Sequence, residues 1–260
     1  MSGRAIEGFL FAAIVALLAR RARSLSTSGA VAATAIGTLA VSAGWGWGAL
    51  LIAYFIASSI ISHLGRAVKE QRTASVVAKS GQRDAMQVMA NGAVFAVAAI
   101  AMILHAELRW WALGAGALAA SAADTWATEI GTLYGGEPRG LLGWRRVPRG
   151  TSGAVSWIGT IAAIAGAVFV AAAATMLGWP PSLAAPIVTG GIVGAFVDSL
   201  LGATVQCRQW CERCERETER DVHDCGTQTR PLRGVPWVNN DVVNLISGAA
   251  GALLAALLSR

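Results

Sequence analysis

Charged residues are scarce in this sequence, where Asp, Glu, Lys and Arg make up 14% of the 260 residues. A soluble domain has roughly 25% charged residues, so the shortage argues against an ordinary soluble enzyme. Cysteine is scarce as well, and four cysteines in 260 residues are too few for a disulfide-stapled scaffold. Hydrophobic residues make up 55% of the chain, which excludes intrinsic disorder. The composition therefore indicates an integral membrane protein.

Long apolar stretches recur along the whole chain. A helix that crosses a bilayer needs about 20 mostly apolar residues. We therefore expect an all-α, polytopic fold in which residues 1–260 form one transmembrane helical domain. About eight membrane-spanning helices are predicted, at 5–19, 30–44, 47–64, 88–105, 109–131, 153–177, 184–205 and 241–259. Because the second range is short, 30–64 is expected to form either a spanning hairpin that turns at Gly44–Gly48 or a re-entrant pair.

Basic residues lie on one side of this predicted topology. Of the 21 Lys and Arg residues, 18 fall in the long polar loops at 20–29, 65–86, 132–152 and 206–240. Cytoplasmic loops of membrane proteins collect Lys and Arg. We therefore expect an inner (cytoplasmic) membrane protein whose loops and active site face the cytoplasm, with both termini outside. Because these loops explain the net charge of +6, no nucleic-acid partner is expected.

Apart from Glu7 near the start of the first predicted helix, the acidic residues inside the predicted helices lie toward the cytoplasmic ends. They are Asp124, Glu129, Asp198 and Asp241. Ionisable residues within membrane spans are costly and usually functional. The alternative is a hydrogen-bonded packing face, but Asp124 and Glu129 in one helix exceed what packing requires. The pattern predicts a metal or substrate site at this end of the helices.

Further polar residues gather where two of the predicted helices begin. They are Arg83, Asp84 and Asn91 at the fourth helix, and Asn239, Asn240, Asp241 and Asn244 at the last. Asn and Asp are also good helix caps, which is the structural alternative. Helix N-termini attract phosphate groups as well. We therefore expect these residues to contact a phosphate-bearing ligand.

The loop before the sixth predicted helix is rich in glycine and small hydroxyl residues. Its sequence is Arg149-Gly150-Thr151-Ser152-Gly153. Such a segment can present backbone N–H groups to phosphate, although a flexible turn has the same composition. It is not a Walker A loop, because the Gly-Lys-Ser/Thr ending is missing.

All four cysteines lie in the loop 206–240, which we expect to be a small folded cytoplasmic segment inserted between the last two helices. Cys211-x2-Cys214 followed by His223-x-Cys225 supplies four ligands at a spacing that suits structural zinc. Cys207 is either spare or replaces His223. The alternative is a set of reduced, unliganded thiols, because disulfides are disfavoured in the cytoplasm.

Several of these motifs together resemble the transmembrane protein 19-like family, also known as domain of unknown function 92. The resemblance covers residues 26–255, and only the combination of motifs is specific. The segments that carry it are Arg83-Asp84-Ala85 with Ala90-Asn91-Gly92, Ala123–Gly131, Arg149–Ser156, Asp198–Thr204, Cys211-x2-Cys214 with Cys225-Gly226-Thr227, and Asn239–Asn244. The chain departs from the family at Ser152, where Asn is common.

The family includes the phytyl-phosphate kinase of plants and cyanobacteria. The resemblance therefore implies Mg²⁺-dependent phosphoryl transfer from a nucleoside triphosphate, CTP or another, to a membrane-held prenyl (isoprenoid) monophosphate. It fixes neither the prenyl chain nor the nucleotide, and a homo-oligomer remains open.

The polar residues suit such chemistry, which needs positioning and charge neutralisation. We assign Asp124, Asp198 and Asp241 as Mg²⁺ ligands, supported by Glu129 and Asn240. The nucleotide and phosphates are assigned to the helix-start residues and the glycine loop named above.

Three alternatives use the same features differently. The first is a lipid nucleotidyltransferase of the CDP-lipid type. The second is a transporter or scramblase of phosphorylated lipids, because acidic residues in membrane spans also mark transport paths. The third is a membrane scaffold whose cysteine loop binds partners, which leaves Asp124 and Asp198 unexplained.

Overall fold

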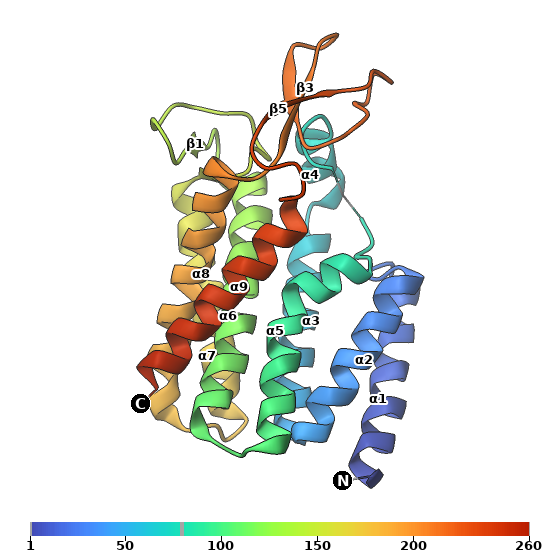
Figure 1. The fold of residues 1–260 in the computed structure, drawn as a ribbon, viewed down its shortest axis with the longest axis vertical. Helices are drawn as coiled ribbons and strands as arrows, with labels where there is room; N and C mark the ends of the chain where they lie inside the picture. Colours follow the sequence, from blue (N-terminus) through green and yellow to red (C-terminus); the bar gives the residue numbers. More distant parts are fainter. Residues whose placement is uncertain (1, 79–80, 260) are drawn as a thin grey trace.

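The computed structural model describes residues 2–78 and 81–259, and this part of the chain is mostly helical. Each predicted apolar range corresponds to a helix (Figure 1), although the range 153–177 begins too early, because Ala154–Val155 form a strand before the helix starts at Trp157. These helices are α1 (Ser2–Arg21), α2 (Thr27–Ala43), α3 (Trp45–His63), α5 (Ala85–Leu104), α6 (Leu108–Tyr134), α7 (Trp157–Met176), α8 (Ala184–Thr204) and α9 (Asn240–Leu258). The short α4 (Arg66–Thr73) and the 3₁₀ helix η1 (Pro181–Leu183) lie in connections.

Five helical segments in the described part of the chain are long and apolar enough to cross a membrane. They are α3, α5, α7, Pro181–Thr204 and α9. Helix α2 is a shorter apolar helix of 17 residues, and α1 and α6 carry charged residues near their ends. The helical, membrane-type fold is therefore confirmed, whereas eight crossings stay a prediction.

Helices α2 and α3 are joined by the single residue Gly44, which is the C-cap of one and the N-cap of the other. The segment 30–64 is thus two helices that meet at the start of the predicted Gly44–Gly48 turn. Side-chain hydroxyls of α2 (Thr34, Thr38 and Ser42) donate to carbonyls four residues earlier. These bonds satisfy the small polar residues within the helix itself.

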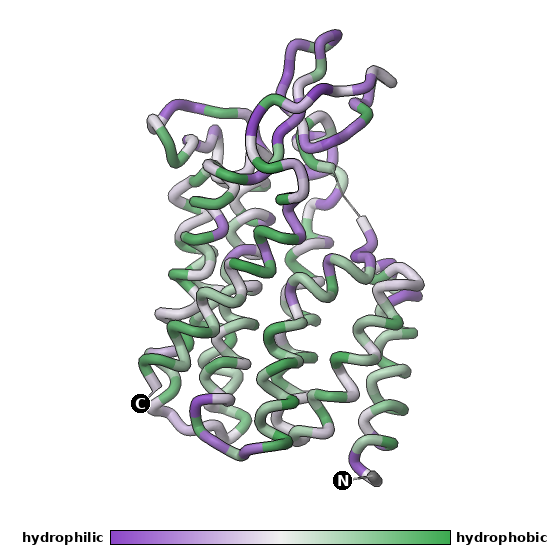
Figure 2. The backbone as a smooth tube through the Cα atoms, in the orientation of Figure 1, coloured by the Kyte–Doolittle hydropathy of each residue, from purple (hydrophilic) through white to green (hydrophobic). Residues whose placement is uncertain are grey.

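The polar loops gather at one end of the bundle, and both termini lie at the other (Figure 1). The tube coloured by hydropathy shows the same division, with hydrophilic residues concentrated around α4 and the loops that carry the strands (Figure 2). The basic loops predicted to share one side therefore do lie together. Which side of a membrane they face stays a prediction.

Helix α6 forms the centre of the bundle and packs against α3, α5, α7, α8 and α9. Its middle turns are almost entirely small and buried, from Gly114 to Ala123. A Cβ added at Gly116 would lie under 3.0 Å from the Cβ of Ala255 on α9. Small residues let helix backbones approach closely in membrane bundles.

In the part of the chain that the structure describes, two small antiparallel sheets interrupt the helical fold in the loops. Strands β1 (Arg139–Gly140) and β2 (Ala154–Val155) pair before α7. Between α8 and α9, strands β3 (Arg208–Cys211), β4 (Arg216–Thr218) and β5 (Arg230–Arg233) form a sheet in the order β4-β3-β5. The cysteine loop is therefore folded, but with β structure that the all-α prediction did not include.

Candidate functional site

Asp124 on α6 and Asp198 on α8 meet inside the bundle, and their carboxyl groups are hydrogen-bonded to each other. Ser247 on α9 donates a second hydrogen bond to Oδ2 of Asp198, at 3.2 Å. Two carboxylates in contact repel each other unless a proton or a cation lies between them. The two predicted residues, which are 74 positions apart in the sequence, are thus brought together.

The pair lies in the half of the bundle nearest the polar loops. Asp124 is ten residues before the end of α6, or about 15 Å along the axis. Asp198 is six residues before the end of α8, or about 9 Å. Because α6 is about 40 Å long and a bilayer core is about 30 Å thick, this end of α6 extends toward the interface.

A polar cluster continues from Asp124 toward α3 and α5. The hydroxyl of Tyr54 is hydrogen-bonded to Ser121 and lies in the electrostatic field of both Arg83 and Asp124. Ser121 in turn donates to the backbone carbonyl of Asn91 at 3.2 Å. Tyr54 was not predicted from the sequence, because a lone tyrosine in an apolar helix carries no signal.

An apolar cavity of about 110 Å³ opens beside this cluster, between α1, α2, α3 and α5. Its wall is mostly Ala, Val, Ile, Leu, Phe and Gly, and its polar lining consists of Tyr54, Arg83, Gln87, Asn91 and Thr125. A single water molecule needs only about 10–15 Å³ of such space. The cavity can therefore hold a stretch of hydrocarbon chain with a polar group at one end.

Arg83 and Asp84 lie at the start of α5, as predicted. Most of their hydrogen bonds cap this helix or join it to neighbouring segments of the protein. Arg83 donates to the hydroxyl of Ser62 at 3.1 Å, and its backbone pairs with Ser24 and Ser26. Asp84 is the N-cap of α5 and forms a capping box with Gln87. The capping alternative for Asp84 is thus realised, whereas the Arg83 side chain borders the cavity.

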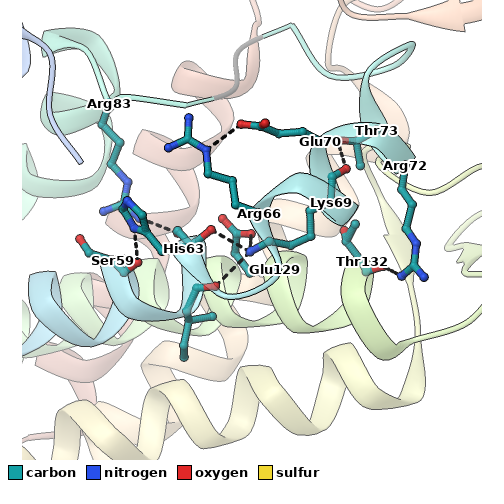
Figure 3. Close-up of polar contacts among 12 residues, drawn as sticks. Ser59, His63, Arg66, Lys69, Glu70, Arg72, Thr73, Arg83, Glu129 and Thr132 are labelled. Carbon is teal, nitrogen blue, oxygen red and sulfur yellow. Dashed lines mark hydrogen bonds and ion pairs between the residues drawn. The ribbon is translucent and has the colours of Figure 1, made fainter. Parts of the chain in front are cut away.

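Glu129 forms an ion pair with Lys69, a residue that the sequence analysis did not single out. Nζ of Lys69 lies 2.5 Å from its carboxylate and also donates to the backbone carbonyls of Ile61 and Ser62. Figure 3 shows Lys69 reaching from α4 to Glu129 on α6 and to the end of α3. The ammonium group is buried, so Glu129 and Lys69 compensate each other's charge and tie three helices together.

The glycine loop before α7 packs directly against the end of α8. A Cβ added at Gly153, where φ is +74°, would lie under 3.0 Å from the backbone of Ala203. Gly150 also has positive φ and faces Thr73. Nε of Arg149 donates to the carbonyl of Gly136 at 2.7 Å. The segment Arg149–Gly153, with Thr151 between the glycines, therefore packs closely against the helices of the bundle, and its glycines make this contact possible.

Glu219 is a residue of this polar end that the sequence did not single out. It lies just after β4 and accepts hydrogen bonds from Oγ of Ser152 at 2.5 Å and Nε2 of Gln206 at 3.0 Å. Arg208 forms a buried ion pair with the same oxygen at 3.3 Å and donates to the carbonyl of Ser152. The negative charge of Glu219 also acts on Asp198. Glu219 thus links the cysteine loop to the glycine loop above the acidic pair.

The polar residues at the start of α9 differ in their role in capping the helix and in their burial. Asn239 is the N-cap, and its side chain accepts a hydrogen bond from the backbone N–H of Val242 at 3.1 Å. Asp241 is buried in the first turn, Asn240 is exposed and Asn244 is half-buried. Asp241 precedes Ser247 by six residues, so it lies about 9 Å closer to the loops than the contact with Asp198.

Three cysteines and a histidine meet in the loop between α8 and α9. The donor atoms of Cys211, Cys214, His223 and Cys225 all lie within 4.8 Å of one another. Cys207 is outside this group, so the geometry favours His223 as the fourth donor. Hydrogen bonds from Thr227 lower the pKa of Cys225 to about 6, while the hydrogen bond with Cys225 raises the pKa of Cys214 to about 11.

Comparison with known proteins finds relatives that extend along most of the chain. PGR of Arabidopsis thaliana is 27% identical over 285 residues, covering 98% of this chain and 96% of that protein. VTE6 of the same plant, a chloroplastic protein, is 29% identical, covering 91% of this chain and 66% of its own length. The membrane protein sll0875 of Synechocystis sp. is 31% identical, covering 82% of this chain and 73% of that protein.

No solved structure matches this chain. The family model described as integral membrane protein DUF92 matches residues 10–252, which include every residue of the site described above. The predicted resemblance is therefore confirmed, and the chain belongs to the DUF92 family of integral membrane proteins.

Proposed function

We propose that this protein transfers a phosphoryl group from a nucleoside triphosphate to a membrane-held prenyl monophosphate, giving the diphosphate. The observation that carries the proposal is the hydrogen-bonded Asp124–Asp198 pair, which lies next to an apolar cavity with a basic, polar end. A lipid-phosphate kinase needs both features side by side. An acidic site alone favours metal binding, and an apolar cavity alone favours lipid binding.

The two carboxyl groups fit a magnesium ion. Mg²⁺ is usually bound by one or two carboxylates together with substrate phosphates, and it neutralises charge on the transferred phosphoryl group. In this assignment Asp124 and Asp198 are the ligands, and the hydroxyl of Ser247 orients Asp198. Asp241 is the third predicted ligand and supports the site from the start of α9.

The prenyl tail fits the cavity between α1, α2, α3 and α5. Its monophosphate would then lie toward Arg83 and Tyr54, at the end where Asp124 is close. A phosphate monoester is already ionised at neutral pH, so the acceptor needs orientation and not a strong general base. The role of Arg83 is to hold the acceptor phosphate.

The nucleotide is assigned to the loop end of the bundle. The glycine loop Arg149–Gly153, anchored through Ser152, supplies backbone N–H groups and the Arg149 guanidinium. Asn239, Asn240 and Asn244 at the start of α9 supply amide groups at the same end. Phosphate and carboxylate groups would thus meet near Asp198.

Family membership supports the reaction class, because the DUF92 resemblance extends to phytyl-phosphate kinase and VTE6 is among the relatives. We further propose that all eight long helices cross the cytoplasmic membrane. The basic loops and the active site would face the cytoplasm, and both termini would lie outside. This arrangement brings a water-soluble nucleotide to a membrane-held acceptor.

The proposal is tested with purified protein in detergent, Mg²⁺, a panel of nucleoside triphosphates that includes CTP, and prenyl monophosphates of several chain lengths. Mass spectrometry of the lipid is expected to show the gain of one phosphate. Asp198→Asn should lower kcat by about 100-fold or more, the usual effect of removing a group that stabilises transferred charge. Glu137→Gln, which changes an exposed acid paired with Arg146, is the matched control and should retain activity.

Other outcomes would overturn the kinase assignment in distinct ways. Gain of a nucleotide would establish a CDP-lipid type transferase. No turnover by folded protein, together with movement of phosphorylated lipid across liposome membranes, would establish a transporter or scramblase. Full activity of Asp198→Asn would remove the acidic pair from the mechanism.

The tail site has an independent test. Ala33→Phe places a ring in the cavity wall on α2 and should raise KM for long prenyl chains more than for short ones. A uniform change across chain lengths, with an unchanged melting temperature, would place the tail elsewhere.

A further inference from the structure

The loop between α8 and α9 contains four donor groups whose ligand atoms lie close together. Cys211 ends strand β3, and Cys214 lies in the turn that joins β3 to β4. His223 and Cys225 lie in a second turn, which is closed by the pairing of Val222 with Gln228. Two turns from separate parts of the loop therefore bring their donor atoms together.

Two of the distances between these donors match the edges of a tetrahedral zinc site. Tetrahedral zinc has Zn–S bonds of about 2.3 Å and Zn–N bonds of about 2.0 Å, which place sulfur atoms about 3.8 Å apart and nitrogen about 3.5 Å from sulfur. Sγ of Cys211 lies 3.6 Å from Sγ of Cys225, and Nδ1 of His223 lies 3.4 Å from the same sulfur. All four donors lie within 4.8 Å of one another.

Burial argues against a chance gathering of thiols. Cys211 is fully buried and His223 is 6% exposed. The loop has little hydrophobic core of its own, since most of β4 and β5 is exposed. Small domains with too little core are commonly stabilised by a metal. Three sulfurs and an imidazole at the centre of such a loop supply a complete ligand set.

We propose that Cys211, Cys214, His223 and Cys225 bind one structural zinc ion, which fixes the β3–β4 hairpin and thereby positions Glu219. Cys211 pairs with Arg216 across the hairpin, and Glu219 follows the last residue of β4. At the other end of β3, Arg208 meets Glu219 and Ser152. The metal centre therefore acts at a distance on the glycine loop and is not itself part of the phosphoryl-transfer site.

The first test is the metal content of the full-length protein purified from zinc-supplemented cells. We expect about one zinc per chain, and loss of that zinc in Cys211→Ser and Cys214→Ser. Cys207→Ser is the matched control, since this cysteine is in the same loop but outside the cluster, and it should retain zinc. Replacement of zinc by cobalt should give the absorption bands of a tetrahedral site with three thiolates and one imidazole.

Three results would overturn the proposal. The first is wild-type protein that contains no zinc and takes up neither zinc nor cobalt. The second is equal zinc loss in Cys207→Ser and Cys214→Ser. The third is a disulfide between Cys211 and Cys225, detected by mass spectrometry of protein alkylated without reduction. None of these readouts requires turnover, so they are separate from any failure of the kinase assignment.

Discussion

The buried ion pair between Arg208 and Glu219 should control whether the cysteine loop stays closed on the bundle. The Arg208 side chain is 0% exposed and that of Glu219 is 9% exposed, so water does not compensate for a lost partner. Glu219→Gln preserves the shape of the side chain but removes its charge. The guanidinium group of Arg208 would then be buried without a counter-ion.

The expected cost follows from this burial. Removing one partner of a buried ion pair typically costs about 3–5 kcal/mol. Three donors meet on Oε1 of Glu219, from Ser152, Gln206 and Arg208, so the site cannot relax easily around a neutral amide. At about 1.4 kcal/mol per factor of ten, the population of the open loop should rise roughly a hundred- to several-thousandfold.

Hydrogen–deuterium exchange of β3, β4 and β5 in detergent measures this opening directly. Glu212→Gln is the matched control, because Glu212 forms an ion pair with Arg230 in the same loop, but both side chains are more than 60% exposed. Such a surface pair is worth about 0–1 kcal/mol, so exchange should increase by less than about fivefold.

Similar exchange in the two variants would refute the reasoning. It would mean that the Arg208–Glu219 contact does not hold the loop, and that the zinc cluster or the strand pairing does so alone. A double variant, Arg208→Met with Glu219→Leu, should recover part of the protection, since an apolar pair leaves no buried charge.

Three further predictions concern the same end of the bundle. Gly153→Ala should destabilise the protein more than Gly136→Ala in thermal unfolding, because both glycines have positive φ but only Gly153 closely approaches another backbone; equal effects would contradict this. Lys69→Met should lower the melting temperature clearly more than Arg66→Met, since it leaves Glu129 without its buried counter-ion, whereas the Arg66 pair is exposed. A zinc chelator should increase proteolysis within the loop between α8 and α9 while the apolar helices stay protected, and an unchanged digestion pattern would argue against a structural metal.

Much of the helical fold could be predicted from hydropathy alone. A span must satisfy its backbone internally, so an apolar run of sufficient length has few alternatives to a helix. Even the difficult segment 30–64 was placed correctly as two helices, because a single crossing would have separated the basic loops. The sheets in the loops were not predicted, since β1 and β2 are only two residues long and are separated by the loop 141–153.

The candidate site was predicted in part. Asp124 and Asp198 were identified because carboxylates are rare in apolar helices, and the structure brings them into contact. Glu219 and Lys69 were missed because both lie in charge-rich segments, where one more charged residue carries no information. The metal-binding role assigned to Asp124 and Asp198 stays a prediction, as do the roles assigned to Asp241 and to the asparagines of α9.

The sequence by itself determined the class of protein, its helices, the gathering of its basic loops at one end of the bundle, and its family. These properties depend on composition and on local sequence patterns, which can be read without knowledge of the fold. The tertiary structure decided which polar groups meet: Asp124 with Asp198, Glu129 with Lys69, and Ser152 with Glu219. Such contacts depend on how close-packed glycine and alanine helices turn relative to one another, and helix rotation is a property of packing that no single segment of sequence specifies.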